Sequence, residues 1–252
     1  MERSTFGDRM KGYEAVSQLH LVRRTPVIIR LDGRAFHTWA KRLKKIDPIL
    51  EKQPYSDVMI DCMMGACTYL THYIQGAVFT YSQSDEISIF LRDWDTLEFE
   101  PWFADNVQKI VSISASMATL AFYAAYERYE KIDYAPHRPM FDSRVFNVPK
   151  EEVANYFIWR QKDAIRNSVN MLGQFHFSQK ELHGKKVDDV KKMLYVEGVD
   201  WEGFKTPYKR GFCVPKKMSI SSASCQPDYD IPVFTENREY IEKWLTNYDG
   251  EM

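Results

Sequence analysis

Two short segments of the chain place acidic residues next to residues that favour a tight turn. Asp32 follows a strand-like run at residues 27–31, apolar except for Arg30, and precedes Gly33, while Asp85 and Glu86 lie in a QSDE segment between two β-rich runs. Mg²⁺ prefers hard oxygen ligands and usually takes one or two carboxylates, which leaves positions for water and substrate phosphate. Two such ions about 3.5–4 Å apart can activate a hydroxyl and stabilise the leaving oxygen of a phosphoryl transfer. The pattern is therefore typical of a metal-dependent phosphoryl-transfer site, with Gly33 allowing the backbone to approach closely.

Both segments also have an ordinary structural interpretation. Asp-Gly is among the commonest turn dipeptides, and Ser-Asp-Glu often occurs in turns and helix caps. The residues alone therefore leave open whether these acids bind metal or only shape the backbone. A metal site requires that Asp32 and Asp85 emerge from the same edge of one sheet, which depends on the elements that carry them.

Apolar spacing and breaker residues divide the chain into elements that could do this. The run at residues 27–31 predicts a buried strand that ends at the Asp-Gly turn, and the β-rich runs on either side of QSDE predict a hairpin. Other patterns predict strands at 141–148 and 208–214, helices at 8–19, 35–45, 57–75, 102–129, 149–172 and 188–196, a capping box at 178–181 and a loop at 219–233. The order of these elements predicts an α+β fold, in which an antiparallel sheet has helices on one face and a small C-terminal region follows.

The composition excludes several classes of protein. The chain has 252 residues, of which 44% are hydrophobic and 27% charged, and its net charge is −1. No apolar run reaches the length of a membrane span, and the polar start does not resemble a signal peptide, so we expect a cytoplasmic protein with no membrane partner. Its four cysteines form neither a CxxC pair nor a zinc-type cluster. Because the charges balance, binding to a nucleic acid would depend on local basic patches.

Five segments of the chain occur in an informative order. They read RLDGRAFH from Arg30, YSQSDEISIF from Tyr81, FDSRVF from Phe141, WRQKDA from Trp159 and YKRG from Tyr208. Together they resemble the tRNA-histidine guanylyltransferase family, and the similarity extends from about residue 8 to residue 214. This resemblance implies a catalytic domain like the palm of nucleic-acid polymerases at residues 1–148. It also implies a region at residues 149–252 that completes the catalytic unit and contacts tRNA, and assembly as a homotetramer.

The resemblance also implies a reaction at the 5′ end of tRNA. In this family a 5′-monophosphate is activated with ATP or GTP, and the 3′-hydroxyl of an incoming nucleotide, usually GTP, attacks the activated phosphate. The expected requirements are therefore two Mg²⁺ ions, ATP, and GTP or another nucleoside triphosphate. The strand grows in the 3′-to-5′ direction, opposite to that of ordinary polymerases.

The resemblance further assigns roles to individual residues. Asp32 and Asp85 would bind the metals together with the Gly33 carbonyl, and Glu86 matches an acid that the family needs for activity. The nucleotide-binding residues would be Asp32, Gly33, Arg34, Ala35, Phe36, His37, Ser84 and Asp85, with Lys44, Lys109 and Arg144 as triphosphate contacts. Lys209 and Arg210 would contact tRNA phosphates.

One segment departs from the pattern of the histidine-specific enzymes. Those enzymes carry His-Ile-Asn-Asn after the WRQ motif, whereas the matching residues here are Ile165, Arg166, Asn167 and Ser168. The sequence resembles instead the guanylyltransferase-like branch, which repairs 5′-truncated tRNAs by template-directed extension. Untemplated addition of G to tRNA-His is the alternative. A nucleotide cyclase on a palm fold and a non-catalytic tRNA-binding protein are more distant ones.

Some basic and aromatic residues outside these roles also bear on RNA binding. The lysines at positions 185, 186, 191 and 192 are expected to form a solvated face. Trp159 and Phe175 could stack on unpaired bases, but we expect both to be buried.

Overall fold

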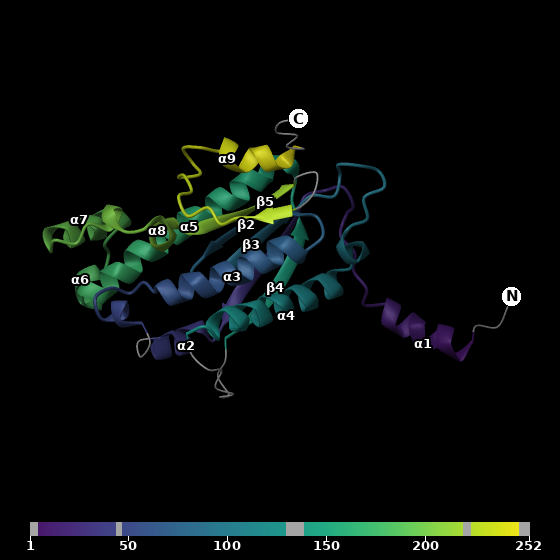
Figure 1. Cartoon of the computed structure of the whole chain (residues 1–252), viewed down its shortest axis with the longest axis horizontal. Helices are drawn as coiled ribbons and strands as arrows, with labels where there is room; N and C mark the ends of the chain where they lie inside the picture. The colour runs from purple at the N-terminus through teal and green to yellow at the C-terminus, as the bar shows by residue number, and fades with distance from the viewer. Residues whose placement is uncertain (1–4, 44–46, 130–138, 219–222, 247–252) are drawn as a thin grey trace.

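Six strands form one antiparallel sheet at the centre of the molecule (Figure 1). The computed structural model describes residues 5–43, 47–129, 139–218 and 223–246. The strands are β1 (Val27–Arg34), β2 (Ala77–Gln83), β3 (Glu86–Leu91), β4 (Met140–Asn147), β5 (Phe212–Met218) and β6 (Ala223–Cys225), in the spatial order β4-β1-β3-β2-β5-β6. The first strand therefore lies beside the hairpin, as the sequence predicts.

A two-residue turn joins β2 to β3. Gln83 pairs with Glu86, so Ser84 and Asp85 form the turn, and Ser84 has a φ of 50°. Positive φ values are usual in two-residue hairpin turns because their backbone twist matches that of the flanking strands. Nearly every residue of the two strands is buried. Burial on both faces explains why the apolar residues of these strands do not alternate strictly with polar ones.

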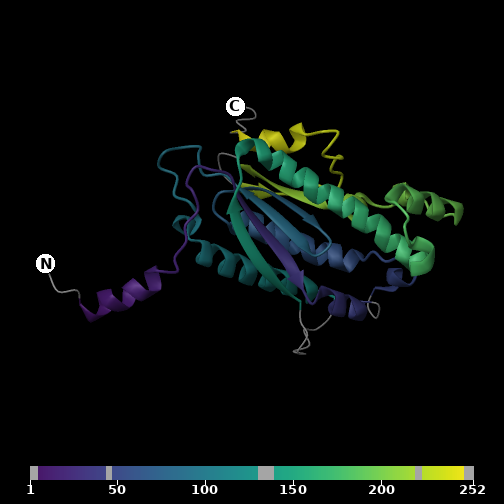
Figure 2. The ribbon, with the colours of Figure 1, turned by 180° about the vertical axis from the view of Figure 1, so that it is seen from behind.

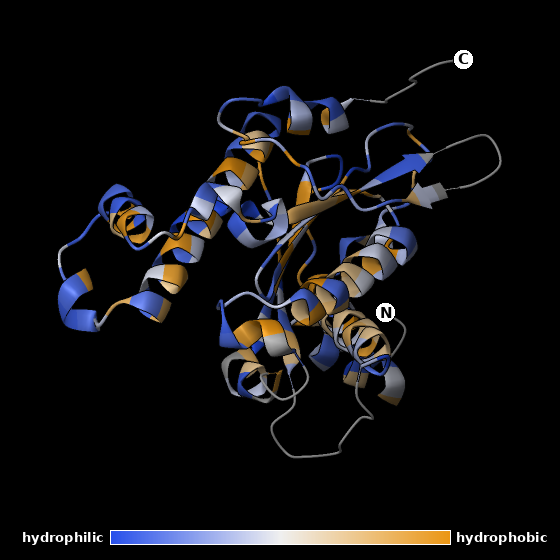
Figure 3. Cartoon of the chain, turned by 60° about the vertical axis from the view of Figure 1, so that its left-hand side comes forward, coloured by the Kyte–Doolittle hydropathy of each residue, from blue (hydrophilic) through white to orange (hydrophobic). Residues whose placement is uncertain are grey.

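Helices α2 (Phe36–Leu43), α3 (Asp57–Tyr73) and α4 (Val107–Tyr126) cover one face of the sheet (Figure 1). Two 3-10 helices precede α3 and α4, at Pro48–Glu51 and Trp102–Asp105. The side chains of Ser56 and Asn106 cap α3 and α4 by accepting hydrogen bonds from backbone amides of the first turn. The hydrophobic residues concentrate on the strands and on the helix sides that pack together (Figure 3).

Helix α5 (Lys150–His176) covers the other face and extends beyond the sheet (Figure 2). Pro149 is its N-cap, in keeping with the predicted start. The C-terminal segment adds a short helix, α9 (Glu239–Glu242), and a 3-10 turn at Lys243–Leu245. Phe79 of β2, Phe157 of α5 and Phe234 are fully buried together in this second core. Helices thus cover one face within residues 1–148, as predicted, and the C-terminal region covers the opposite face.

The remaining helices lie at the periphery. Helices α6 (Gln179–Leu182), α7 (Val187–Val196) and α8 (Thr206–Arg210), with a 3-10 turn at Trp201–Gly203, surround the far end of α5. Their core contains Leu172 of α5 and Leu194 of α7. Helix α1 (Phe6–Ala15) projects away from the body and buries none of its residues (Figure 1).

Several sequence predictions differ from the structure in their boundaries or type. The strand expected at 208–214 begins only at Phe212, because residues 206–210 form helix α8: Pro207 fits the first turn of a helix and Gly211, with a φ of 81°, ends it. The helix expected from residue 102 begins at Val107, since residues 103–105 all have positive φ. Strand β6 lies within the segment expected to be a loop. The capping box at Ser178 is confirmed. Among the described residues, no helix is both long and apolar enough to cross a membrane.

Candidate active site

The end of β1 and the tip of the β2–β3 hairpin meet where these central strands end. This end of the sheet is called the Asp32 edge below. Asp32 pairs directly with Glu86 across the two strands, and Asp85 is the neighbour of Glu86 in the turn. Paired residues of antiparallel strands have Cα atoms about 4.5–5.5 Å apart. The structure therefore brings the two segments together as expected, and Asp32 and Asp85 are both only partly buried there.

Gly33 is the point at which β1 touches the hairpin tip. A Cβ atom on Gly33 would lie 2.7 Å from the Cβ of Asp85 and 2.4 Å from Cδ2 of Phe36. Real carbon atoms do not approach so closely without displacement, because unbonded carbons are best separated by about 3.5–4.0 Å. Only glycine allows the turn to pack this close to Asp32.

The two aspartates interact electrostatically. Burial raises the pKa of the Asp85 carboxyl, and the negative charges of Asp32 and Glu86 raise it further. Hydrogen bonds from its own backbone amide and from Ser84 lower the same pKa. A cation between the carboxylates would remove the repulsion and favour the ionised form.

The donor set at this edge suits Mg²⁺. Both side-chain ligands are hard carboxylate oxygens, and their mutual repulsion shows that negative charge is concentrated at the site. In the described part of the chain, no group of three or more His, Cys, Asp or Glu residues could hold a metal. Two carboxylates would leave an Mg²⁺ ion positions for water and substrate phosphate.

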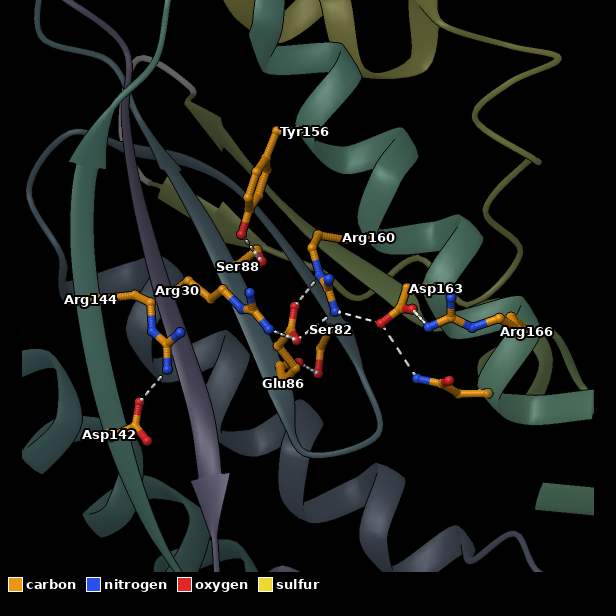
Figure 4. Close-up of polar contacts among 11 residues, drawn as sticks. Arg30, Ser82, Glu86, Ser88, Asp142, Arg144, Tyr156, Arg160, Asp163 and Arg166 are labelled. Carbon is orange, nitrogen blue, oxygen red and sulfur yellow. Dashed lines mark hydrogen bonds and ion pairs between the residues drawn. The ribbon is translucent and has the colours of Figure 1, made fainter. Parts of the chain in front are cut away.

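Glu86 points into a buried cluster with two arginines on the α5 side of the sheet (Figure 4). Arg160 of α5 donates from Nε to Oε1 at 2.6 Å and from Nη2 to Oε2 at 2.8 Å, and Arg30 of β1 donates to Oε2 at 2.7 Å. The side chains of Glu86 and Arg160 are only 6% and 5% exposed. This bidentate pair joins the first residue of β3 to α5, so Glu86 fixes the hairpin relative to the helix.

Further hydrogen bonds hold β3 in place. The Oγ atom of Ser82 donates to the backbone carbonyl of Glu86 at 3.0 Å, and the hydroxyls of Ser88 and Tyr156 lie 2.8 Å apart (Figure 4). Arg160 also bridges to Asp163 at 3.0 Å. The strand that leads away from Asp85 is therefore bonded to its neighbouring strand and to α5.

A protein family matches the part of the chain that contains this geometry. A family model described as tRNAHis guanylyltransferase matches residues 7–149, more than half of the chain and all of the elements that form the Asp32 edge. The chain belongs to the tRNAHis guanylyltransferase family. It is thereby a nucleotidyltransferase of tRNA processing that uses nucleotide substrates.

Relatives and solved structures agree with this assignment. Probable tRNA(His) guanylyltransferase of Drosophila melanogaster is 25% identical over 206 residues, which cover 77% of this chain and 68% of that protein. tRNA(His) guanylyltransferase of Candida glabrata is 24% identical over 82% of this chain and 91% of its own length. A bacterial tRNA(His) guanylyltransferase (Thg1)-like protein in complex with ATP superimposes with a TM-score of 0.84 at 36% identity, covering 96% of this chain and 99% of that one. The same description with GTP gives 0.79 and 35% over the same shares. The α+β fold class is confirmed.

The predicted nucleotide-binding segment after Asp32 is only partly at the surface. Arg34 and Ala35 are exposed at the end of β1, and Ala35 has a φ of 66°. The Phe36 ring, in contrast, is buried in the core, with its centroid 5.1 Å from those of Phe122 and Phe141. The expected nucleotide contact of Phe36 therefore falls to its backbone amide at the helix start, which remains a prediction. The backbone of His37 continues α2, and Ser84 is exposed at the hairpin tip.

The expected triphosphate contacts lie in different places. Arg144 of β4 pairs with Arg30 and forms an ion pair with Asp142 at 3.2 Å, on the same face of the sheet as Asp32. Lys109 lies in the first turn of α4, thirteen residues before Phe122, which contacts Phe36 near the site. Thirteen residues span about 20 Å of helix, so Lys109 is remote from the Asp32 edge within one chain. Lys44 lies outside the described residues.

The two expected tRNA contacts are engaged within the chain. The Lys209 ammonium is largely buried, donates to the Glu202 carbonyl at 2.6 Å and lies 5.5 Å from the Trp201 ring centroid. Burial lowers the pKa of Lys209. The Nε of Arg210 donates to the Ile231 carbonyl at 2.9 Å. Lys209 therefore stabilises the α8 region, where sequence reasoning expected it to grip RNA.

Sequence reasoning assigned no role to Arg30 and Arg160, which the structure places around Glu86. A signal was available for Arg30, because a charged residue inside a continuous apolar strand requires a buried partner. Arg160 gave no such signal, since arginine is common on helix surfaces.

Proposed function

We propose that this chain adds nucleotides to the 5′ end of tRNA in the 3′-to-5′ direction, directed by the opposing strand. The observation that carries the proposal is the meeting of Asp32 and Asp85 at one sheet edge, with Gly33 packed against the turn. Similarity over nearly the whole length to a bacterial Thg1-like protein described in complex with ATP and with GTP supports it. The catalytic, metal-binding and nucleotide-binding roles of individual residues belong to the same proposal.

In this proposal Asp32, Asp85 and the Gly33 carbonyl hold the metal and face the phosphates. Bound Mg²⁺ would supply charge neutralisation at the phosphates and a more acidic hydroxyl for attack. Glu86 does not face substrate, because both its oxygens accept hydrogen bonds from arginines. We therefore assign Glu86 as a positioning residue that keeps the hairpin, and so Asp85, in register with β1.

The reaction consists of two phosphoryl transfers. In the first, an oxygen of the RNA 5′-monophosphate bonds to the α-phosphorus of ATP and pyrophosphate leaves, which gives an adenylylated 5′ end. In the second, the 3′-hydroxyl of the incoming nucleoside triphosphate bonds to the 5′-phosphorus of the RNA. AMP leaves, and the hydroxyl proton is released to solvent. In this proposal the exposed Arg34 and Arg144 stabilise phosphate charge.

The segment that departs from the histidine-specific pattern favours template-directed repair. Ser168 is buried, its Oγ lies 3.0 Å from the Tyr55 hydroxyl, and it donates to the Tyr208 carbonyl at 2.8 Å. It also accepts a hydrogen bond from Trp201 Nε1 at 3.0 Å. Its small side chain thus serves the packing between α5 and α8, and this position does not present the asparagine of the His-Ile-Asn-Asn pattern to RNA.

Assembly and domain organisation extend the proposal. Helix α1 leaves the body and exposes Phe6, Tyr13 and the nearby Val16, which a second copy of the chain could cover in a homotetramer. Residues 149–252 complete the catalytic unit in this view, because they contribute Arg160 and add β5 and β6 to the sheet. A cytoplasmic location is part of the same proposal.

The decisive experiment uses a tRNA that lacks its first nucleotide and carries a 5′-monophosphate, with Mg²⁺, ATP and labelled nucleoside triphosphates. We expect one nucleotide to be added, with a base that changes when the opposing base is changed. Asp32→Asn and Asp85→Asn should abolish addition and also remove the rise in melting temperature that Mg²⁺ gives the wild type. Asp188→Asn, an exposed acid on α7, serves as the control and should change neither.

Two outcomes would contradict parts of this proposal. Addition of G whatever the opposing base would replace repair by untemplated guanylylation. Failure to extend any RNA, including one that already carries a 5′-triphosphate, would overturn the 5′-end transfer itself.

A further inference from the structure

Trp159 of α5 is 53% exposed, although the sequence favours its burial. We propose that its indole ring is a stacking platform for a nucleobase of the terminal base pair of the RNA acceptor stem. The inference rests on the proposed function for its substrate, and it assigns to this chain a contact that the metal and nucleotide-binding residues do not provide.

The Trp159 ring is held in place by its neighbours. The Tyr156 ring packs against it at an interplanar angle of 67°, with centroids 6.0 Å apart. The guanidinium carbons of Arg160 and Arg30 lie 4.4 Å and 5.8 Å from the Trp159 centroid. Both arginines bind the same Glu86 carboxylate, so they approach the ring from the side of that buried group. The ring is thus fixed from one side and open to solvent elsewhere, and its order is established before a base arrives.

Trp159 lies over the face of the sheet that carries Asp32. Arg30, which contacts the ring, is two residues before Asp32 on β1, and alternate residues of a strand point to the same face about 7 Å apart. The ring is therefore roughly 10–15 Å from the Asp32 carboxylate. A strand whose 5′ end reaches Asp32 would have its terminal base pair beside Trp159.

Exposed arginines flank the ring on both sides. Arg144 on β4 lies directly across from Arg30 and its side chain is 52% exposed. Arg166 lies seven residues after Trp159, on the same side of α5 and about 10 Å along its axis, with a side chain that is 59% exposed. Each is paired with an aspartate, Asp142 or Asp163, on its own element (Figure 4). These cations are spaced to meet phosphates on either side of a stacked base.

This arrangement favours RNA over a protein partner. Protein interfaces have an apolar centre, whereas the exposed neighbours of Trp159 on β4 and α5 include Arg144 and Arg166. An aromatic ring between cations is the arrangement with which proteins bind single-stranded and unpaired nucleotides, because the ring stacks on a base and the cations meet the backbone. The span from Arg144 to Arg166 also exceeds one nucleotide, which favours a strand over a free triphosphate.

The first test measures the affinity of the wild type for the truncated 5′-monophosphate tRNA without nucleoside triphosphates. We expect Trp159→Ala to raise the Kd for this tRNA roughly 5- to 150-fold, which corresponds to the loss of one stacked base, while Trp159→Phe stays close to wild type. Tyr73→Ala, an exposed aromatic of α3 on the opposite face of the sheet, is the matched control and should leave the Kd unchanged. The KM for GTP should not rise in Trp159→Ala.

The second test identifies stacking directly. Two further tRNAs carry an abasic site, one at the 5′-terminal nucleotide and one at the nucleotide opposite it. Removal of the base that stacks on Trp159 should weaken binding of that tRNA to the wild type. On the same abasic tRNA, Trp159→Ala should then have the same Kd as the wild type. A structural effect of the substitution would instead weaken binding to all three tRNAs equally.

The outcomes separate this inference from the proposed function. Equal losses on all three tRNAs, an unchanged Kd in Trp159→Ala, or a rise confined to the KM for GTP would each overturn the stacking platform, and none would affect extension by the wild type. Binding by the wild type without extension would overturn the function, while the abasic series still decides the role of Trp159. A wild-type protein that neither binds nor extends the tRNA would overturn both.

Discussion

Replacement of Gly33 by alanine adds a single methyl group where β1 touches the hairpin tip. The substitution keeps the backbone carbonyl that we assign to the metal, and changes neither aspartate. It therefore tests whether the close packing of the turn against β1, and not only the presence of the acidic groups, determines activity.

The expected displacement follows from the contacts of the missing Cβ. To reach about 3.5 Å, a methyl carbon now 2.7 Å from the Asp85 Cβ must move apart from it by about 0.8 Å, and one 2.4 Å from Phe36 by about 1.1 Å. The Phe36 ring cannot turn away freely, because the rings of Trp39, Phe122 and Phe141 pack edge-on against it. The hairpin tip must therefore move. Overpacking of this kind costs about 1–3 kcal/mol, and a misplacement near 1 Å at a reactive group lowers the rate by about 100-fold.

The measurements are kcat/KM for nucleotide addition to the truncated tRNA, urea unfolding, and the rise in melting temperature with Mg²⁺. We expect Gly33→Ala to lose about 1–3 kcal/mol of stability, about 100-fold in kcat/KM and most of the Mg²⁺ effect. Gly12→Ala is the control, since a Cβ there meets nothing within 4 Å in α1. That variant should be as stable as the wild type or up to about 1 kcal/mol more stable, with full activity.

A second variant separates the active-site effect from general destabilisation. Phe36→Leu in the Gly33→Ala background replaces the ring that meets the new methyl group with a smaller side chain, but the contact of that methyl group with Asp85 remains. We expect the double variant to be about as stable as Phe36→Leu alone and still slow. A Gly33→Ala protein that binds Mg²⁺ and adds nucleotides at the wild-type rate would refute the inference that this contact positions Asp85.

Two further substitutions test the assignments of Glu86 and Lys209. Glu86→Gln leaves Arg160 and Arg30 without their shared counter-charge, so urea unfolding should show a loss of about 3–5 kcal/mol in the free energy of unfolding. The control is Glu242→Gln, whose partner Arg238 is also exposed and whose loss should stay below about 1 kcal/mol. Equal losses would contradict the positioning role. Lys209→Ala should lower stability by about 1–2 kcal/mol and leave the salt dependence of tRNA binding unchanged, because the ammonium already donates to a carbonyl; a shallower salt dependence would restore it as a phosphate contact.

The strands at the site could be predicted because local signals and the sheet agree. Residues 27–31 are apolar except for Arg30 and show no alternation, as expected for a strand buried on both faces, and the QSDE segment interrupts two β-rich runs. The closeness of Asp32 and Asp85 then required only that the strand lie beside the hairpin, and the structure contains this pairing. The positions of short strands joined by tight turns can therefore be predicted largely from their own residues.

The surroundings of Glu86 could not be predicted in the same way. Its partner Arg160 lies 74 residues later in the chain, on a helix whose angle across the sheet depends on the whole second core. Periodicity indicates that α5 is amphipathic but does not indicate which arginine reaches which carboxylate. The same reason explains the error for Trp159: its helical position borders the apolar side, and only the course of α5 past β4 leaves the ring exposed.

The remote position of Lys109 has a different cause. The sequence around Lys109 gives no information on the direction of α4, which runs from the Val27 end of the sheet towards Phe36. A lysine in the first turn of that helix is therefore carried away from Asp32 by the length of the helix. The expectation for Lys209 failed for a related reason. A basic pair in a short segment was expected to be exposed, but the fold of α8 buries Lys209, one of its two members.

The hairpin tip is held from both faces of the sheet, and this links the proposed catalytic edge to the proposed RNA-binding face. On one face Gly33 admits the turn against the Phe36 cluster, and on the other Arg160 fixes Glu86, the residue next to Asp85. Arg160 is also the closer of the two cations that contact the Trp159 ring. A base stacked on Trp159 would therefore load a ring that packs on the Arg160 guanidinium. The same guanidinium binds Glu86 at the start of β3. Correct placement of the RNA and correct placement of Asp85 then depend on one buried ion pair, so loss of Glu86 should weaken tRNA binding as well as catalysis.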